Sequence, residues 1–385
     1  MNQTTQQMKQ GDKRPFRFFD NREKYLLFTT TTTEKQETAK RICQELHHLN
    51  PRPPAFRVFQ AGAGEGTMLN LVLRHLHHGW PTVPLLVVVK EISPQFIRMA
   101  VRNLADRFRE HPELVLVFTN MRYAEAPRLT PATSAQCAQL QWRELALTGT
   151  SSHGFEAQIN AEMAFVNEGW QFEEDRASGT WRYVNPAVLV IHRADQAFVL
   201  DRIVPRRGGD GPAYDLIVAS HPYRSRRSAD SKVRNLLGPL ARSLAPGGRM
   251  ITIQARGDDP GMEIIERLWP GSEPFPTPRA ALIAALRAAV HAEDPDLEFP
   301  DLAQAEAEFR YQLRLNPHET ESSIGTSTLL AAWNAAAYVA QIEDQRLTEA
   351  MCDSAYLEAT RAVLSRHTGL WFNDEAFVVA RRAAA

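Results

Sequence analysis

Residues 57–67 read RVFQAGAGEGT, a short apolar stretch that runs into three alternating glycines. The apolar residues are suited to the interior of a sheet, and the glycines allow a sharp turn where a side chain would block a ligand. Leucine and valine then recur at helical spacing up to residue 77. The stretch predicts a strand, a loop and a helix whose N-terminal amides favour a ligand with a carboxylate or phosphate. The three glycines are Gly62, Gly64 and Gly66.

A second buried strand is predicted one βαβ unit later. Residues 84–89 form a continuous apolar run, typical of a parallel strand covered on both faces, and the run ends at Lys90 and Glu91. An acidic residue at the carboxyl end of the second strand is where a Rossmann-type sheet binds the two hydroxyls of a ribose. The alternative is a surface glutamate that caps the helix beginning at Ser93 and Pro94.

Two further motifs follow in the chain. Residues 214–220, YDLIVAS, predict another buried strand that ends in His221, Pro222 and Tyr223, and residues 244–248 read LAPGG before a further apolar stretch. In order and spacing, the glycine loop, Glu91, the D-L-I of the third motif and the LAPGG turn resemble class I S-adenosylmethionine-dependent methyltransferases. The resemblance covers roughly residues 57–254.

The resemblance implies an α/β fold with a Rossmann-like, doubly wound, mostly parallel sheet, a mid-chain α+β insertion at about 122–212 and a helical C-terminal lid insertion. It also implies S-adenosyl-L-methionine as co-substrate. Gln60 stands where the family often has an acid, and its amide oxygen can still accept a hydrogen bond from the methionine ammonium. The implied cofactor residues are Gln60, Gly62, Ala63, Gly64, Gly66, Thr67, Glu91, Ile92, Asn120, Met121 and Ser220.

The third strand has two candidates. Residues 113–119, ELVLVFT, keep the usual spacing after Glu91, and they place Asn120 and Met121 at the corner that contacts adenine in the resembled family. The alternative is residues 188–192 with Asp195 at that corner. In the preferred interpretation, residues 188–192 instead form a hairpin with residues 198–204.

The length of 385 residues is enough for two or three domains. Helical patterns fill much of the region after the LAPGG motif, including residues 302–313, and residues 370–381 predict a last strand. The expected segments are a disordered tail at 1–15, an N-terminal helical segment at 16–50, a cofactor-binding domain at 51–255, a helical lid or substrate region at 256–369, and a final strand and tail at 370–385.

A small-molecule acceptor is expected, with a nitrogen or oxygen nucleophile. His221 is the candidate general base because its unperturbed pKa lies near neutrality, and Tyr223 is the candidate for orienting the acceptor. Arginines at 224, 226 and 227 suggest an acceptor with an acidic group, although they can also be solvated or pair with Asp230. The candidate substrate residues, for which ordinary packing is the alternative, are Tyr25, Arg224, Trp333, Asn334 and Tyr338.

Composition narrows the function classes. With 44 basic and 45 acidic residues, no overall field attracts nucleic acid or a membrane, so neither is expected as a partner. The 3 separate cysteines suit a reducing cytoplasm and give no metal-ligand spacing, and no metal is expected. The insertion can shape substrate entry or a homodimer interface. An aminopropyltransferase-like enzyme and a non-catalytic cofactor-binding module remain alternatives.

Overall fold

The computed structural model describes residues 21–175, 180–315 and 324–383. The tail expected at residues 1–15 and the first residues of the expected N-terminal helical segment lie outside this range. So do the last two residues of the expected C-terminal tail.

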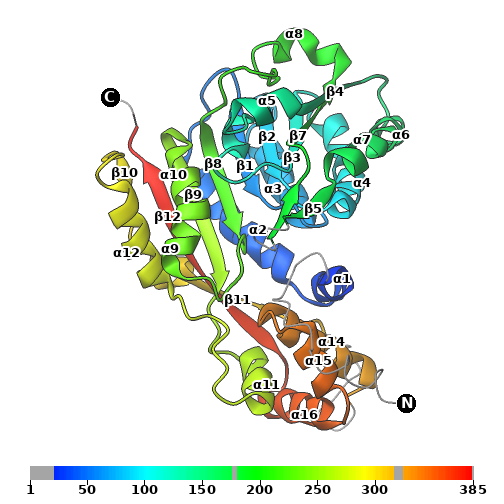
Figure 1. Cartoon of the computed structure of the whole chain (residues 1–385), viewed down its shortest axis with the longest axis vertical. Coiled ribbons are helices and arrows are strands. Elements are labelled where there is room, and N and C mark those ends of the chain that lie inside the picture. Colours follow the sequence, from blue (N-terminus) through cyan, green and yellow to red (C-terminus); the bar gives the residue numbers. More distant parts are fainter. Residues whose placement is uncertain (1–20, 176–179, 316–323, 384–385) are drawn as a thin grey trace.

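One mixed sheet of 10 strands forms the centre of the described chain (Figure 1). Its order is β10-β12-β9-β8-β1-β2-β3-β7-β4, and β11 also pairs with β12. The strands are β1 (Phe56–Ala61), β2 (Leu85–Lys90), β3 (Leu114–Thr119), β4 (Gln141–Leu147), β7 (Ala187–Arg193), β8 (Tyr214–Ser220), β9 (Leu244–Ala255), β10 (Leu297–Glu298), β11 (Glu308–Gln312) and β12 (Trp371–Arg381).

The strands β3, β2, β1, β8 and β9 run parallel to their neighbours, so their carboxyl ends lie along one edge of the sheet. β12 returns antiparallel to β9, and β10 and β11 pair antiparallel with β12. The chain winds one way from β1 to β3 and the other way from β8 to β9, so a ligand crevice is expected between β1 and β8. This is the Rossmann-like arrangement of class I methyltransferases, which confirms the predicted fold class.

Helices cover both faces of this sheet because β1, β2 and β3 are apolar on alternate sides, giving two separate cores. One face carries α2 (Glu34–Glu45), α3 (Thr67–Gly79), α4 (Pro94–Glu110), α6 (Ser152–Ala161) and α7 (Met163–Gly169). The other carries α9 (Ala229–Lys232), a π-helix (Val233–Leu237), α10 (Gly238–Arg242) and α12 (Arg279–Val290).

A third core lies beside β11 and one end of β12, next to the helices at the lower end of Figure 1. It is built from α1 (Arg22–Thr31), α11 (Pro260–Leu268), α14 (Thr326–Val339), α15 (Asp344–Ala350) and α16 (Ala355–His367). The remaining elements are α5 (Ser134–Gln139), α8 (Ala197–Leu200), α13 (Gln304–Ala307), a small sheet of β5 (Phe172–Asp175) and β6 (Thr180–Tyr183), and 3-10 turns at Leu46–His48, Ala126–Arg128 and Ala194–Gln196.

The preferred third strand is confirmed, since β3 pairs in parallel with β2. Residues 188–192 belong to β7, which pairs antiparallel with β3. The hairpin with residues 198–204 is wrong, because the chain after β7 forms a 3-10 turn and α8. Leu200 is fully buried while Phe198 is 95% exposed, so the apolar residues there cannot share one face of a strand.

The helix expected at residues 302–313 is also wrong, because only α13 is helical and β11 follows it. Tyr311 on β11 is buried and its ring stacks on Phe372 of β12 at 5.3 Å between centroids. Pairing with β12 therefore overrides a helical pattern that was short and weakly apolar. The predicted last strand is confirmed as β12.

Candidate functional site

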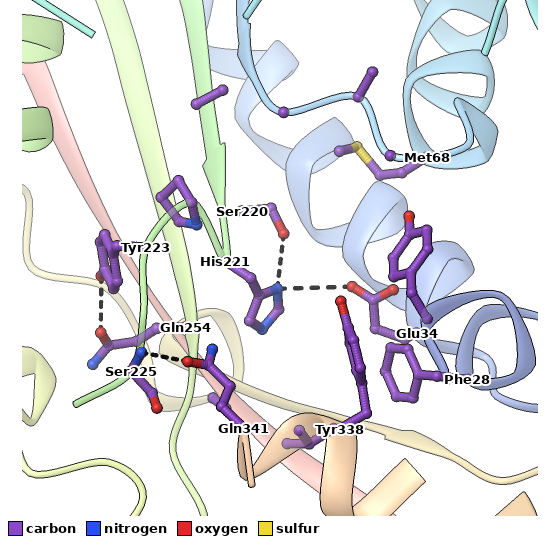
Figure 2. Close-up of a pocket in the computed structure, with 18 of the residues that line it drawn as sticks. Phe28, Glu34, Met68, Ser220, His221, Tyr223, Ser225, Gln254, Tyr338 and Gln341 are labelled. Atoms are coloured by element: carbon purple, nitrogen blue, oxygen red, sulfur yellow. Dashed lines mark hydrogen bonds and ion pairs between the residues drawn. The ribbon is translucent and has the colours of Figure 1, made fainter. Parts of the chain in front are cut away.

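A cavity opens at the carboxyl ends of β1, β2, β8 and β9. The glycine loop, the residues after β2 and residues 220–223 after β8 form one part of its wall. The other part comes from α1, the start of α2, β11 and the end of α14. The cavity therefore lies in the crevice that the sheet topology creates, and it is closed by segments distant in sequence (Figure 2).

The glycine loop adopts left-handed backbone angles that favour glycine. Gly62, Gly64 and Gly66 have φ values of 100°, 54° and 90°. A Cβ at Gly64 would overlap the Tyr25 hydroxyl, and one at Gly66 would lie 2.7 Å from Ala100 Cα on α4. The absence of a side chain at Gly64 thus permits the close approach of the Tyr25 ring on the cavity side. The absence of one at Gly66 permits close packing of α3 against α4.

Glu91 is bound to the glycine loop through its carboxylate. Oε2 accepts hydrogen bonds from the backbone N–H groups of Ala63 at 2.9 Å and Gly64 at 3.1 Å. Oε1 accepts from Ile92 N at 2.7 Å and Ser93 N at 3.0 Å. Burial raises the pKa of Glu91, while the amide of Ser93, the charge of Lys90 and the other amides oppose the rise.

The insertion supports this corner from behind. Trp170, at the end of α7, donates its indole N–H to the Glu91 carbonyl at 2.8 Å, and the Tyr183 hydroxyl donates to the Ile92 carbonyl at 2.6 Å. Both side chains fix the backbone on which the acidic residue sits. Sequence reasoning missed them because nothing in the local pattern indicates which distant backbone they reach.

Gln60 lies behind the loop, outside the cavity lining. Its Nε2 donates to the Gly62 carbonyl at 2.7 Å, which braces the turn. Its Oε1 is buried and has no hydrogen-bond partner among the described residues. Because Gln60 does not line the cavity, the role that the structure shows for it is to brace the loop.

His221 follows β8 directly and has a left-handed φ of 46°. Its Nε2 lies 3.3 Å from Asp374 Oδ1 on β12, and its Nδ1 lies 3.1 Å from Ser220 Oγ and 3.8 Å from Glu34 Oε1 on α2. Because a carboxylate only accepts, Asp374 favours the tautomer with the proton on Nε2 and leaves Nδ1 as an acceptor. Figure 2 shows His221 between Ser220 and Glu34.

The charges around His221 are coupled. Burial lowers the pKa of His221, but Asp374 and then Glu34 outweigh it, so the pKa is raised above its usual value. Burial raises the pKa of Asp374, and His221 opposes that rise. Burial would also raise the pKa of Glu34, yet Lys35 and His221 hold it below its usual value. The histidine therefore binds a proton more strongly than a free imidazole.

Beyond His221 the cavity is polar. The Tyr223 hydroxyl donates to Gln254 Oε1 at 2.8 Å, and Gln254 Nε2 donates to the Thr277 carbonyl at 2.9 Å. Lys232 also lines this end and is buried. Lys90 is a second buried lysine of the lining, and burial lowers its pKa to about 8 against the attraction of Glu91.

Several sequence-predicted residues come together here. From the cofactor set, Gly62, Ala63, Gly64, Glu91, Ile92 and Ser220 line the cavity, together with His221, Tyr223, Tyr25 and Tyr338 from the catalytic and substrate sets.

Other sequence-predicted residues lie elsewhere. Asn120 uses its side chain to hold the chain around β7, since Nδ2 donates to the Gly169 and Asn185 carbonyls and Oδ1 accepts from Ala187 N. Trp333 packs against Trp269 and Tyr356 in the third core. Outside the lining are Gln60, Gly66, Thr67, Asn120, Met121, Arg224, Trp333 and Asn334.

Sequence reasoning missed Glu34, Asp374 and Lys232. Asp374 carried a signal, because an acid inside the otherwise apolar last strand requires a buried partner. Glu34 and Lys232 carried none, because charged residues at helix ends are ordinarily solvated.

Among the described residues, no group of three or more His, Cys, Asp or Glu side chains is placed to hold a metal ion, and no helix has the length and apolar character to cross a membrane.

Comparison with known proteins gives no match in sequence and several in structure. No family model and no curated protein matches the chain. A putative sarcosine dimethylglycine methyltransferase from Galdieria sulphuraria matches with 9% identity and a TM-score of 0.36, covering 91% of this chain and 85% of that one. A geranyl diphosphate methyltransferase in complex with GPP and sinefungin matches with 11% identity and a TM-score of 0.32, covering 90% and 77%.

PKMT2 from Rickettsia typhi in complex with AdoHcy matches with 12% identity and a TM-score of 0.30, covering 89% of this chain and 52% of that one. All three matches have low identity and low TM-scores, so they decide nothing about activity or substrate. The fold assignment rests on the strand order and directions of this chain, and the argument about function rests on the cavity.

Proposed function

We propose that the chain is an S-adenosylmethionine-dependent methyltransferase that acts on a small molecule through a nitrogen or oxygen nucleophile. The observation that carries this proposal is that one cavity joins a glycine loop, the acid Glu91 and an ionisable His221 at the ends of neighbouring parallel strands. A Rossmann-like sheet binds its nucleotide-type ligand at that edge. The histidine then stands where the reacting end of the ligand is expected.

The residues present fit this cofactor. Glu91 lines the cavity at the end of β2 with the carboxylate oxygens that ribose hydroxyls require, and the bonds from the Ala63 and Gly64 amides hold the glycine loop against it. The bound cofactor supplies a methyl group that is already activated by the positive charge on sulfur. The protein's part is therefore to align the acceptor and exclude water.

His221 is the group that takes the acceptor's proton. Asp374 holds the Nε2 proton in place, and Nδ1 is left to receive a proton from a hydroxyl or ammonium on the cavity side. Asp374 acts here as a positioning residue, since it acts through His221. The cavity is enclosed by Tyr25 and Phe28 of α1 and Tyr338 of α14, which favours a small acceptor over a polymer.

Replacing Asp374 with asparagine is expected to move the acidic limb of the pH–rate profile. The unchanged enzyme should gain activity as pH rises through the raised pKa of His221, above about 6.5. Without the Asp374 charge this pKa falls, so the limb should move to lower pH by about one unit or more. The measurement is kcat/KM for the acceptor against pH. Asp195→Asn, outside the cavity, is the matched control, and an unmoved limb in Asp374→Asn would contradict the role.

Replacing Glu91 with alanine is expected to weaken S-adenosylmethionine and S-adenosylhomocysteine alike. The change removes a charged acceptor for the ribose and also frees the amides of Ala63 and Gly64, so a loss of about 1.5–3 kcal/mol, roughly 10- to 100-fold, is expected. Calorimetry measures both affinities. Glu91→Gln keeps the volume and should lose less, Glu113→Ala is the control, and unchanged affinity for both ligands would remove Glu91 from the site.

The function itself is tested by turnover. The purified chain is incubated with S-adenosylmethionine and pooled small molecules, and mass spectrometry follows S-adenosylhomocysteine and methylated products. A binding module would be stabilised against heat by the cofactor without consuming it. An aminopropyltransferase-like enzyme would release a product with a different added mass from decarboxylated S-adenosylmethionine. That second class remains a candidate because Glu34 and Asp374 bring two buried acids to His221.

A further inference from the structure

The cavity extends past His221 into a polar end that the cofactor site does not use. Figure 2 shows Tyr223, Ser225 and Gln254 on one side of His221, with Met68 and Glu34 on the other side. Since Met68 follows the glycine loop, the cofactor side and the polar end lie on opposite sides of the histidine. The polar end is therefore the region in which an acceptor would be held.

The polar end presents donors without partners. Lys232 is 3% exposed and its Nζ lies 4.7 Å from the centroid of the Tyr223 ring. This side-chain ammonium has no hydrogen bond or ion pair with other described residues. Ser225 Oγ is likewise buried without a partner in the described chain. Gln341 Oε1 accepts from Ser225 N at 3.0 Å, and that bond leaves its Nε2 group as a donor.

The acid that attracts Lys232 already accepts two hydrogen bonds through one of its oxygens. Glu375 of β12 attracts Lys232, but its Oε1 accepts from Gln254 Nε2 at 2.6 Å and from Arg279 N at 2.8 Å. The Tyr223 hydroxyl donates to Gln254, and Lys232 contacts the ring of this tyrosine. Lys232 Nζ thus has an attractive charge in Glu375 but no hydrogen-bond acceptor within the described chain, and a buried ammonium without such an acceptor is costly.

The arginines expected to bind an acidic acceptor are placed differently. Arg226 Nη1 donates to the carbonyls of Ala340 at 3.0 Å and Gln341 at 2.9 Å, so this arginine holds the end of α14. Gln341 has a left-handed φ of 51°, which these bonds help to maintain. Arg226 therefore positions Gln341, and the lysine that lines the polar end of the cavity is Lys232.

We propose that Lys232, Ser225 and Gln341 bind an anionic group of the acceptor, a carboxylate or a phosphate. The assignment of this group to an acceptor rests on the proposed function, whereas the anion site itself does not depend on turnover. An anion there would supply the missing partner of Lys232 and accept from Ser225 Oγ and Gln341 Nε2. It would also hold the acceptor by the end that is remote from the cofactor, so that its nucleophile faces His221.

The test compares anionic probes with neutral partners that lack the anionic group. The probes are 3-phenylpropionate against 3-phenylpropanamide for the carboxylate, and phenyl phosphate against phenol for the phosphate. Calorimetry with the full chain, with and without S-adenosylhomocysteine, should show about 10- to 100-fold tighter binding of an anionic probe than of its neutral partner. The pair with the larger ratio identifies which anion the site takes.

Lys232→Met should abolish this preference while leaving the affinity for S-adenosylhomocysteine unchanged. Lys40→Met, at an exposed lysine, is the matched control. Because burial lowers the pKa of Lys232 to about 8 while Glu375 opposes the fall, the preference should also weaken as pH rises above about 8 in the unchanged protein. If Lys232→Met does not fold, Ser225→Ala, which removes one hydroxyl, should still reduce the preference.

Equal binding of anionic and neutral probes, no binding of either anionic probe, or an undiminished preference in Lys232→Met would each overturn the proposal. These outcomes are separable from failure of the proposed function. If the cofactor binds but anionic probes are not preferred, the anion site is refuted and the methyltransferase proposal is unaffected. If anionic probes are preferred through Lys232 but the cofactor does not bind, the anion site is supported and the methyltransferase proposal is refuted.

Discussion

His221→Asn should lower kcat for methyl transfer by about 10²- to 10⁴-fold, the usual contribution of a positioned general base. Asparagine is chosen because it tolerates the left-handed backbone at this position, where φ is 46°. It removes the imidazole that accepts the acceptor's proton, and it leaves the glycine loop and Glu91 unchanged. The measurement is kcat with both substrates saturating.

Two controls separate catalysis from folding in this variant. The affinity for S-adenosylhomocysteine should be nearly unchanged, because the cofactor contacts lie on the loop side of His221. His75→Asn changes an exposed histidine on α3 and should leave kcat unaltered. Full activity of His221→Asn would mean that the acceptor reaches the cofactor already deprotonated and that His221 only packs between Asp374 and Glu34.

Gly64→Val should abolish cofactor binding, with an affinity at least about 100-fold lower, or about 2.8 kcal/mol. Two physical effects act together. A β-branched residue is strained at the φ of 54° found there, and its side chain would occupy the face of the loop that the ligand must approach. The chain should remain folded, because the strain is confined to a loop. Calorimetry and thermal unfolding measure the two quantities.

The contact with Tyr25 requires a further variant. A Cβ at Gly64 would meet the Tyr25 hydroxyl, so loss of binding could arise from displacement of α1 alone. Tyr25→Phe removes that hydroxyl and should by itself leave cofactor binding largely intact. In the double variant, binding should remain lost. If the double variant binds the cofactor again, Gly64 serves the packing of α1. Gly79→Ala is the control substitution, because the space around Gly79 is open.

The sequence by itself predicted the fold class and the meeting of the glycine loop, Glu91 and His221 at one edge of the sheet. The glycine loop, Glu91 and His221 each stand at the end of an apolar run, and the order of the motifs gives the order of the strands. Because parallel strands place their carboxyl ends at one edge, residues that follow different strands were expected to meet. The same argument placed the third strand at residues 113–119, and β3 confirms that choice.

The hydrogen-bond partners of Asn120 and Arg226 could not be predicted from the sequence. Each has the chemistry that its predicted role requires, yet the Asn120 side chain serves the backbone around β7 and Arg226 serves the carbonyls at the end of α14. Buried backbone carbonyls and amides need hydrogen-bond partners, and a nearby polar side chain often supplies them. Which backbone groups are buried near a given side chain is known only once distant segments are packed.

The acceptor side was decided only by the tertiary structure. Asp374 reaches His221 because β12 returns antiparallel beside β9, and Glu34 reaches it because α2 packs against the sheet. Lys232 became a cavity residue because it is the buried end of α9 and contacts the Tyr223 ring. These side chains come from distant parts of the chain. Their charges interact strongly because they are buried together, where the dielectric constant is low. The pattern of residues along the sequence does not indicate which charges will be buried together.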